Sequence, residues 1–234
     1  MTFRRLPFFM LLALLLVNVA PLAAQDEVEC EEGFRPFEHF VETTCIPVQP
    51  ERIAAIPSDL VATPLLDFGA PVIATNFGEQ EDGTIYVRGA SDILGEATVE
   101  EANLISLGTT AFNFEVLLEA NPDLIIGMSF SEDLYDQLSA IAPTILIEWP
   151  TPVFEHLELI ADAAGISGVY DEQLAEYEAR IAEARERIGD PASITISRLD
   201  IAADGIWYYP DTGALEQVIA DIGFSQPEIQ ANAT

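Results

Sequence analysis

The sequence of 234 residues contains no lysine, so all nine of its lysine-plus-arginine positions are arginine. Forty acidic residues stand against these nine, and the formal net charge is -31. Nucleic acids and anionic lipid surfaces would repel such a chain, so we expect neither as a partner. The acidity itself favours solubility or life at high salt over a specific basic partner.

The sequence is also poor in residues that carry catalysis or bind metals. His39 and His156 are its only histidines, and neither stands in a metal-ligand spacing such as HxxxH. There is no G-x-S-x-G elbow and no glycine-rich phosphate loop. We therefore expect no enzyme, no metal site and no cofactor of the protein's own. A secreted α/β hydrolase is the alternative from another class, and a screen with ester substrates would test it.

A long apolar run occurs only at the N-terminus. Two arginines precede the apolar stretch Leu6 to Val19, and small residues that suit cleavage follow up to Ala24. This order predicts a secretory signal peptide over residues 1–24, although an uncleaved anchor is the alternative. No later segment is apolar enough to cross a bilayer. We expect a mature protein that is soluble in the periplasm.

The only two cysteines, Cys30 and Cys45, follow this signal closely. In an oxidising compartment the pair predicts a disulfide that staples a Glu-rich leader over residues 25–50. A closed loop of about 15 residues would stabilise the fold by roughly 3 kcal/mol. Lipidation of Cys30 is the alternative, but Glu27-Val28-Glu29 lacks the small and apolar residues of a lipobox. We therefore predict a free periplasmic protein and not a lipoprotein.

Residues 51–166 alternate between apolar runs and helical patterns. Continuous apolar runs separated by helices are typical of a parallel sheet that is covered on both faces. A loop-rich stretch at 78–97 interrupts the pattern. The predicted strands are 52–57, 71–75, 123–127 and 144–149, and the predicted helices are 59–69, 113–120, 132–141 and 152–165.

A long helix is predicted over 171–188 because apolar side chains recur there at spacings of three and four. Glu176–Arg180 and Glu183–Arg187 form i,i+4 pairs on its exposed side. Gly189 and Pro191 end it.

The part that follows the helix, residues 191–234, predicts strands at 193–199 and 206–209 and a helix at 215–222. These elements cannot bury a core of their own, since a domain usually needs on the order of 100 residues. We expect this second lobe to be incomplete.

Four segments of the sequence, taken in their order along the chain, are similar to the corresponding segments of a known protein family. They are Pro50-Glu51-Arg52-Ile53-Ala54-Ala55-Ile56; Leu107-Gly108 with Asn113-Phe114-Glu115 and Asn121-Pro122-Asp123-Leu124-Ile125-Ile126-Gly127; the helix 171–188; and Ser197-Arg198-Leu199 with Asp221-Ile222-Gly223-Phe224-Ser225-Gln226-Pro227. Together they resemble the FecB-like iron-siderophore substrate-binding proteins of ABC importers, which are class III periplasmic binding proteins. The resemblance extends over residues 50–234.

The resemblance implies an α/β fold of two Rossmann-like lobes joined by a single long helix. The division would be an N-terminal lobe at 51–166, an interlobe helix at 167–190 and a partial C-terminal lobe at 191–234. A ferric siderophore would bind between the lobes of a monomer, at the carboxyl ends of the strands, with iron present only inside the chelate. ABC permease subunits would be the partner. Cobalamin or haem on the same fold is the alternative.

The same resemblance assigns Glu115 to permease docking, although a helix first-turn carboxylate favoured by the dipole would also explain it. Where some hydroxamate-binding members carry an arginine, Thr109-Thr110-Ala111-Phe112 is neutral, which argues against a strongly anionic chelate.

The candidate ligand-binding residues lie where strands end. Asp59 would otherwise be an N-cap, one of Trp207 and Tyr208 is expected in the core, and a mid-strand Arg198 needs a charged partner or a wet pocket. Arginine and aromatic side chains would suit an anionic chelate with flat rings. The candidates are Ser58, Asp59, Phe77, Thr109, Thr110, Met128, Ser129, Phe130, Trp149, Arg198, Trp207 and Tyr209.

Overall fold

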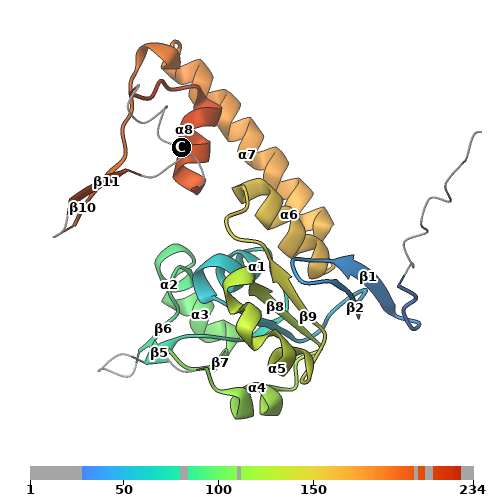
Figure 1. Cartoon of the computed structure of the whole chain (residues 1–234). Coiled ribbons are helices and arrows are strands. Elements are labelled where there is room, and N and C mark those ends of the chain that lie inside the picture. The colour runs from blue at the N-terminus through green and yellow to red at the C-terminus, as the bar shows by residue number, and fades with distance from the viewer. Residues whose placement is uncertain (1–27, 80–83, 110–111, 203–204, 209–212, 228–234) are drawn as a thin grey trace, which may run out of the picture.

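The computed structural model describes residues 28–79, 84–109, 112–202, 205–208 and 213–227. The predicted signal peptide lies outside these residues. A large sheet-containing lobe is connected by the long helix α7 to a smaller C-terminal part (Figure 1). In the described part of the chain, no helix has the length and apolar character that a membrane span requires.

The large lobe is built on a five-stranded parallel sheet with the order β7-β4-β3-β8-β9. All residues of β3, β8 and β9 are buried, because helices cover both faces of the sheet. This confirms the parallel α/β arrangement that the apolar runs predict. The strands are β3 (Ile53–Ala55), β4 (Val72–Thr75), β7 (Ile105–Ser106), β8 (Leu124–Met128) and β9 (Thr144–Ile147).

The two faces of the sheet bury separate hydrophobic clusters. Along β8, Ile126 belongs to the cluster under one helical layer and Ile125 to the cluster under the other, as the period of two requires. The first layer is formed by the π-helical turn η1 (Ser58–Ala62), α1 (Thr63–Asp67) and α6 (Val153–Ala163). The second is formed by α4 (Phe114–Ala120) and α5 (Tyr135–Ser139), which the 3-10 helix η2 (Ser129–Leu134) precedes.

The stretch predicted to be loop-rich contains short regular elements. Val87, Ala90 and Val99 are buried with Phe77 in a small cluster of their own, so tertiary packing stabilises pieces that are too short to be read from periodicity. The prediction of a loop-rich stretch at 78–97 was therefore wrong for the residues of these elements. The elements are β5 (Gly78–Glu79), β6 (Ile85–Tyr86), α2 (Ala90–Ile93) and α3 (Glu96–Ala102).

The leader forms a hairpin of β1 (Phe34–Glu38) and β2 (Thr43–Pro47), and the disulfide between Cys30 and Cys45 is confirmed. The hairpin packs against the edge of the large sheet. The backbone N–H of Phe40 donates to the carbonyl of Leu146 in β9 at 2.9 Å, and the Leu146 N–H donates to His39 Nδ1 at 3.3 Å. These contacts cover an edge strand that would otherwise be open.

The connector α7 (Ser167–Ile188) begins four residues before the predicted helix and carries α8 (Ala214–Ile222) against its C-terminal half (Figure 1). The fold class is confirmed. The predicted strand at 193–199 was wrong, however. A 3-10 turn, η3 (Pro191–Ser193), stands at its start, and the strand β10 (Leu199–Ala202) begins at its end, because only those residues pair with β11 (Gly205–Tyr208).

Candidate functional site

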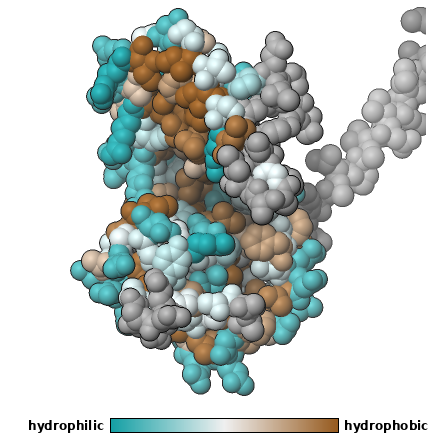
Figure 2. All heavy atoms as spheres, turned by 90° about the vertical axis from the view of Figure 1, so that its left-hand side faces the viewer, coloured by the Kyte–Doolittle hydropathy of each residue, from teal (hydrophilic) through white to brown (hydrophobic). Residues whose placement is uncertain are grey.

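A cavity of about 480 Å³ lies between the large lobe and the start of α8. Figure 2 looks onto the side where the two parts of the molecule face each other and shows apolar atoms in the recess between them. The walls are mostly apolar. The residues that line the cavity are Asp59, Leu60, Thr63, Pro64 and Asp67 of η1 and α1; Ile93 and Leu94 at the end of α2; Trp149, Thr151, Val153, His156 and Leu157 before and in α6; and Gly213 and Ala214 at the start of α8.

Parallel strands direct chain segments into this cavity. β3 leads into η1 and so places Asp59, and β9 leads through Trp149 into α6. Both strands end at the same edge of the sheet, where open α/β sheets bind ligands. Trp149 is 46% exposed, an unusual fraction for a side chain of its size, and offers a flat apolar surface to the cavity.

The carboxylate of Asp59 is held in place by two contacts. Oδ2 lies 2.7 Å from an Arg88 guanidinium nitrogen, and Oδ1 accepts from the Leu60 N–H at 3.1 Å. Pro57, and not Asp59, is the N-cap of η1, so the capping interpretation of Asp59 was wrong. Asp67 at the end of α1 is exposed.

His156 is a buried polar side chain of the cavity wall. Its Nε2 lies 2.8 Å from the carbonyl oxygen of Leu60, and since a carbonyl only accepts, Nε2 carries the proton. Burial lowers the pKa of His156, and the bond to Leu60 offsets only part of this effect, so the ring is neutral near pH 7. Nδ1 is then a lone-pair acceptor, and it is buried without a hydrogen-bond partner among the described residues.

Arg198, one of the candidates from the sequence, has the charged partner that such a position needs. Its guanidinium lies 2.6 Å from Oε1 of Glu216, whose side chain is 4% exposed, compared with 41% for Arg198. The other oxygen, Oε2, is buried and has no hydrogen-bond partner in the described part of the chain. It lies so close to Gly213 that a Cβ there would force the Glu216 carboxylate to move.

The remaining candidates are spread over several environments. Phe77 and Met128 are buried in hydrophobic clusters, so neither side chain reaches the cavity. The N–H of Ser58 donates to Asn76 Oδ1, and the Ser129 hydroxyl accepts from the Trp149 N–H at 3.0 Å.

Other candidates lie at the surface or outside the described part. Phe130 and Thr109 are exposed and do not line the cavity. Thr110 and Tyr209 lie outside the described residues, and the side chain of Trp207 is not described.

Sequence reasoning missed most of the cavity wall. The strand-end rule finds only Asp59 and Trp149, because it looks at the first residues after each strand. His156, Asp67 and Leu157 lie on helices, and Gly213 comes from the far part of the chain. No local signal marks these positions. The described residues contain no group of three His, Cys, Asp or Glu side chains that could hold a metal ion.

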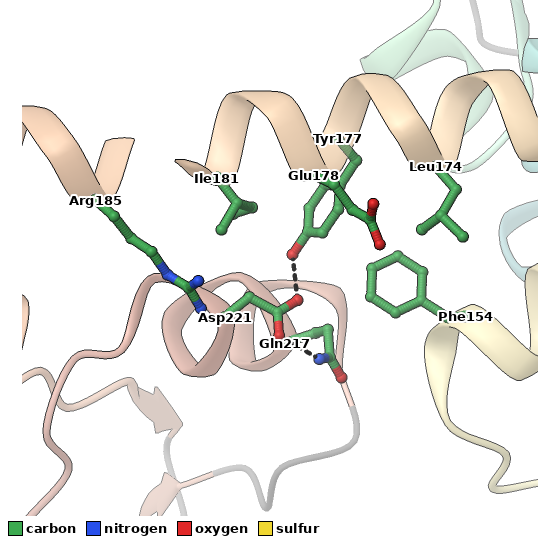
Figure 3. Close-up of a pocket in the computed structure, with 8 residues that line it drawn as sticks. All are labelled: Phe154, Leu174, Tyr177, Glu178, Ile181, Arg185, Gln217 and Asp221. Carbon is green, nitrogen blue, oxygen red and sulfur yellow. Dashed lines mark hydrogen bonds between the residues drawn. The ribbon is translucent and has the colours of Figure 1, made fainter. Parts of the chain in front are cut away.

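A second hollow, of about 470 Å³, lies where α7 meets α8 (Figure 3). The Tyr177 hydroxyl donates to Asp221 Oδ2 at 2.7 Å, and Gln217 Nε2 donates to Asp221 Oδ1 at 3.0 Å. Burial and the bond to Asp221 raise the pKa of Tyr177 well above its usual value. The Tyr177–Asp221 bond attaches α8 to the connector α7.

Comparison with known proteins places these features in a family. The family model described as "Periplasmic binding protein" matches residues 96–227. The probable siderophore-binding lipoprotein YfiY of Bacillus subtilis is 29% identical over 223 residues, which are 91% of this chain and 63% of the relative. The ferric enterobactin-binding periplasmic protein FepB of Escherichia coli O6:H1 is 27% identical over 193 residues, 78% of this chain and 59% of the relative. The chain thus spans about six tenths of the length of these relatives.

The solved structures agree on the fold. Staphylococcus aureus SirA complexed with staphyloferrin B superposes with a TM-score of 0.67 at 20% identity, and the match covers 84% of this chain and 66% of SirA. At this identity the likeness shows the fold alone and nothing of the ligand.

Proposed function

Because the chain belongs to the periplasmic binding protein family, we propose that it is the extracytoplasmic substrate-binding protein of an ABC importer and holds a ferric siderophore between its lobes. It acts as a monomer and is not an enzyme. Iron enters as part of the chelate, and the protein contacts the organic shell. The names of the relatives YfiY and FepB, one siderophore-binding and one ferric enterobactin-binding, support this ligand class.

The observation that carries the proposal is the cavity at the carboxyl ends of β3 and β9. Its volume of about 480 Å³ lies in the usual range of roughly 300–1,000 Å³ for small-molecule sites. Apolar walls with a few polar groups suit a bulky chelate with exposed methylene or aromatic surface. Since one stiff helix connects the lobes, closure over the ligand involves a small hinge motion.

Ligand titration tests the proposal, with the fluorescence of Trp149 as the reporter and calorimetry in parallel. Ferric hydroxamates and ferric catecholates are titrated beside haem and cobalamin. We expect saturable quenching by at least one ferric chelate, and loss of most of the quenching, but not of the calorimetric binding, in Trp149→Phe. Quenching by cobalamin or haem alone would show that the protein binds that ligand and not a ferric siderophore.

The permease is the proposed partner, and Glu115 is its proposed contact. Asn113 caps α4 by accepting from the N–H groups of Glu115 and Val116, both at 3.1 Å. The Glu115 side chain is exposed, on a helix at the end of the large lobe remote from α8 (Figure 1). Glu115→Ala is expected to reduce uptake in cells and leave the ligand Kd unchanged, whereas Glu119→Ala on the same helix leaves both unchanged. Equal uptake in the two variants would remove Glu115 from the interface.

We propose further that the mature protein is not lipid-anchored. The relatives YfiY and FepB differ in this respect, since one is a lipoprotein and the other a periplasmic protein. The disulfide supports the free form, because it occupies both cysteines of the sequence and leaves no thiol for a lipid. The intact mass of protein purified from the native host is expected to match the unmodified chain, and a diacylglycerol adduct would contradict this.

A further inference from the structure

The polar groups of the interlobe cavity differ in kind from those that an anionic ligand needs. Two carboxylates, Asp59 and Asp67, line it, and no arginine does among the described residues of its wall. Two arginines beside the cavity are both in ion pairs: Arg88 with Asp59 at 2.7 Å and Arg198 with Glu216 at 2.6 Å. Asp67 also lines a neighbouring hollow with Arg180, and that arginine is paired with Glu176. If each pair counts as neutral, the charge that remains is the negative charge of Asp67.

The position of Asp67 in the fold strengthens the negative potential that its carboxylate adds to the cavity. It is the last residue of α1, where the free carbonyl groups of the helix end add to the negative potential. No described residue forms a hydrogen bond or ion pair with its side chain. The surrounding protein carries a net charge of -31, which adds a field of the same sign.

Two buried acceptors in or behind the cavity wall have no donor among the described residues. His156 is 6% exposed and lines the wall, and its Nδ1 has no hydrogen-bond partner in that part of the chain. Glu216 Oε2 is likewise unpaired and lies against Gly213, which forms part of the opposite wall. Buried polar groups are normally hydrogen-bonded, so the open acceptor of His156 in the cavity wall indicates a ligand that brings N–H or O–H donors, whereas Glu216 Oε2 lies behind Gly213 and does not itself line the cavity.

From these contacts, and resting on the proposed function, we infer that the cavity selects its chelate by charge. It takes a neutral or cationic, donor-bearing ferric chelate and discriminates against an anionic one of the same shape. Asp67 sets the charge preference and His156 Nδ1 accepts a hydrogen bond from the ligand.

A series of three chelates that differ at one group tests the charge preference. The probes are a linear ferric trihydroxamate with a free terminal ammonium, the same chelate acetylated at that amine, and the same chelate succinylated there. Their terminal groups are cationic, neutral and anionic. We expect the Kd to rise along this series by about tenfold in total at low salt, and the spread to shrink at 0.5 M salt, as screening of a partly exposed charge requires.

Asp67→Asn keeps the size of the side chain and removes the charge. It is expected to bring the three Kd values to within about twofold of one another, whereas Glu172→Gln, an exposed change on α7 outside the cavity, keeps the spread. Equal Kd values in the unmodified protein, or tighter binding of the succinylated chelate, would overturn the charge preference and leave the proposed function standing. If none of the three chelates binds, and no ferric catecholate binds either, the proposed function itself is contradicted.

His156→Gln separates the hydrogen bond from the charge. Glutamine can still donate to the Leu60 carbonyl, as Nε2 does, but it has no acceptor at the position of Nδ1. We expect all three chelates to bind about tenfold more weakly with the spread between them unchanged. Unchanged affinities, with circular dichroism confirming the fold, would exclude His156 from ligand contact.

Discussion

The two parts that face each other across the cavity are stabilised in different ways. The large lobe buries whole strands, and its hydrophobic clusters lie on both faces of the sheet. Among the residues from 191 onward whose side-chain burial is described, by contrast, which leaves out most of β10 and β11, only Glu216 and Ile219 are buried. Polar contacts connect that part to the rest, such as the Tyr177–Asp221 bond at 2.7 Å. The proposed ligand would thus meet one wall formed by a packed core and one wall with little buried apolar surface, which we expect to open at the lower cost.

Truncation in the core of the large lobe has the largest expected effect. Ile126→Ala in the central strand β8 is expected to lower the free energy of unfolding by about 2–5 kcal/mol, because it removes buried volume between packed layers. Leu215→Ala on the exposed side of α8 is the control and should stay within about 0.5 kcal/mol. Urea denaturation followed by circular dichroism measures the free energy of unfolding of both variants. Equal decreases in the two variants would contradict the difference in stabilisation between the two parts.

Breaking the pair of Arg198 and Glu216 tests the polar attachment of the second part. Arg198→Met leaves a buried carboxylate without its partner, and we expect a loss of about 1–3 kcal/mol, below that of a fully buried pair because Arg198 is partly exposed. Native-state hydrogen exchange should show the loss at the amides of α8 and not at those of β8. A uniform loss over both would mean that the two parts unfold as one unit.

Mild acid is expected to act on the large lobe alone. Burial lowers the pKa of His156 in the folded protein. As the pH falls through about 6.5, this histidine is therefore protonated in the unfolded chain before it is protonated in the folded one. The stabilising contribution is complete above pH 6.5 and is lost as the pH falls below it. Both histidines of the sequence precede α7, so exchange protection in α8 should not change between pH 7.5 and 5.5. His156→Gln should remove the part of this pH dependence that comes from His156 and leave the part that comes from His39, whose pKa burial also lowers, and an unaltered profile would contradict this cause.

The smallest expected effect concerns the connector itself. Glu176 and Arg180 form an i,i+4 pair in which both side chains are largely exposed. Glu176→Gln is expected to cost about 0.3–0.5 kcal/mol at low salt and nothing measurable at 1 M salt. A larger or salt-independent loss would show that α7 depends on this pair more than on its packing against α6 and α8.

The fold was largely predictable because its information is local. Apolar runs such as Leu124-Ile125-Ile126 end at Pro or Gly positions, and only a doubly covered strand can bury them on both sides. The spacing of Leu174, Tyr177 and Ile181 likewise determines a helix. Elements of two to seven residues between 78 and 107 could not be predicted, since the cluster around Phe77 and Val99 stabilises them.

The strand at 193–199 was misplaced for a related reason. An alternation such as Ile194 and Ile196 fits any extended chain, and only the partner β11 decides which residues pair.

The sequence by itself therefore determined the layers of the large lobe, the connecting helix and the two strand ends at Asp59 and Trp149. Only the tertiary structure decided the cavity, because α8 must fold back on α7 before Gly213 faces the helix that carries His156. It also decided the partners of Arg88 and Arg198. Periodicity records which side of an element is buried, whereas charge pairing and open acceptors depend on contacts between segments far apart in the chain, which no local pattern encodes.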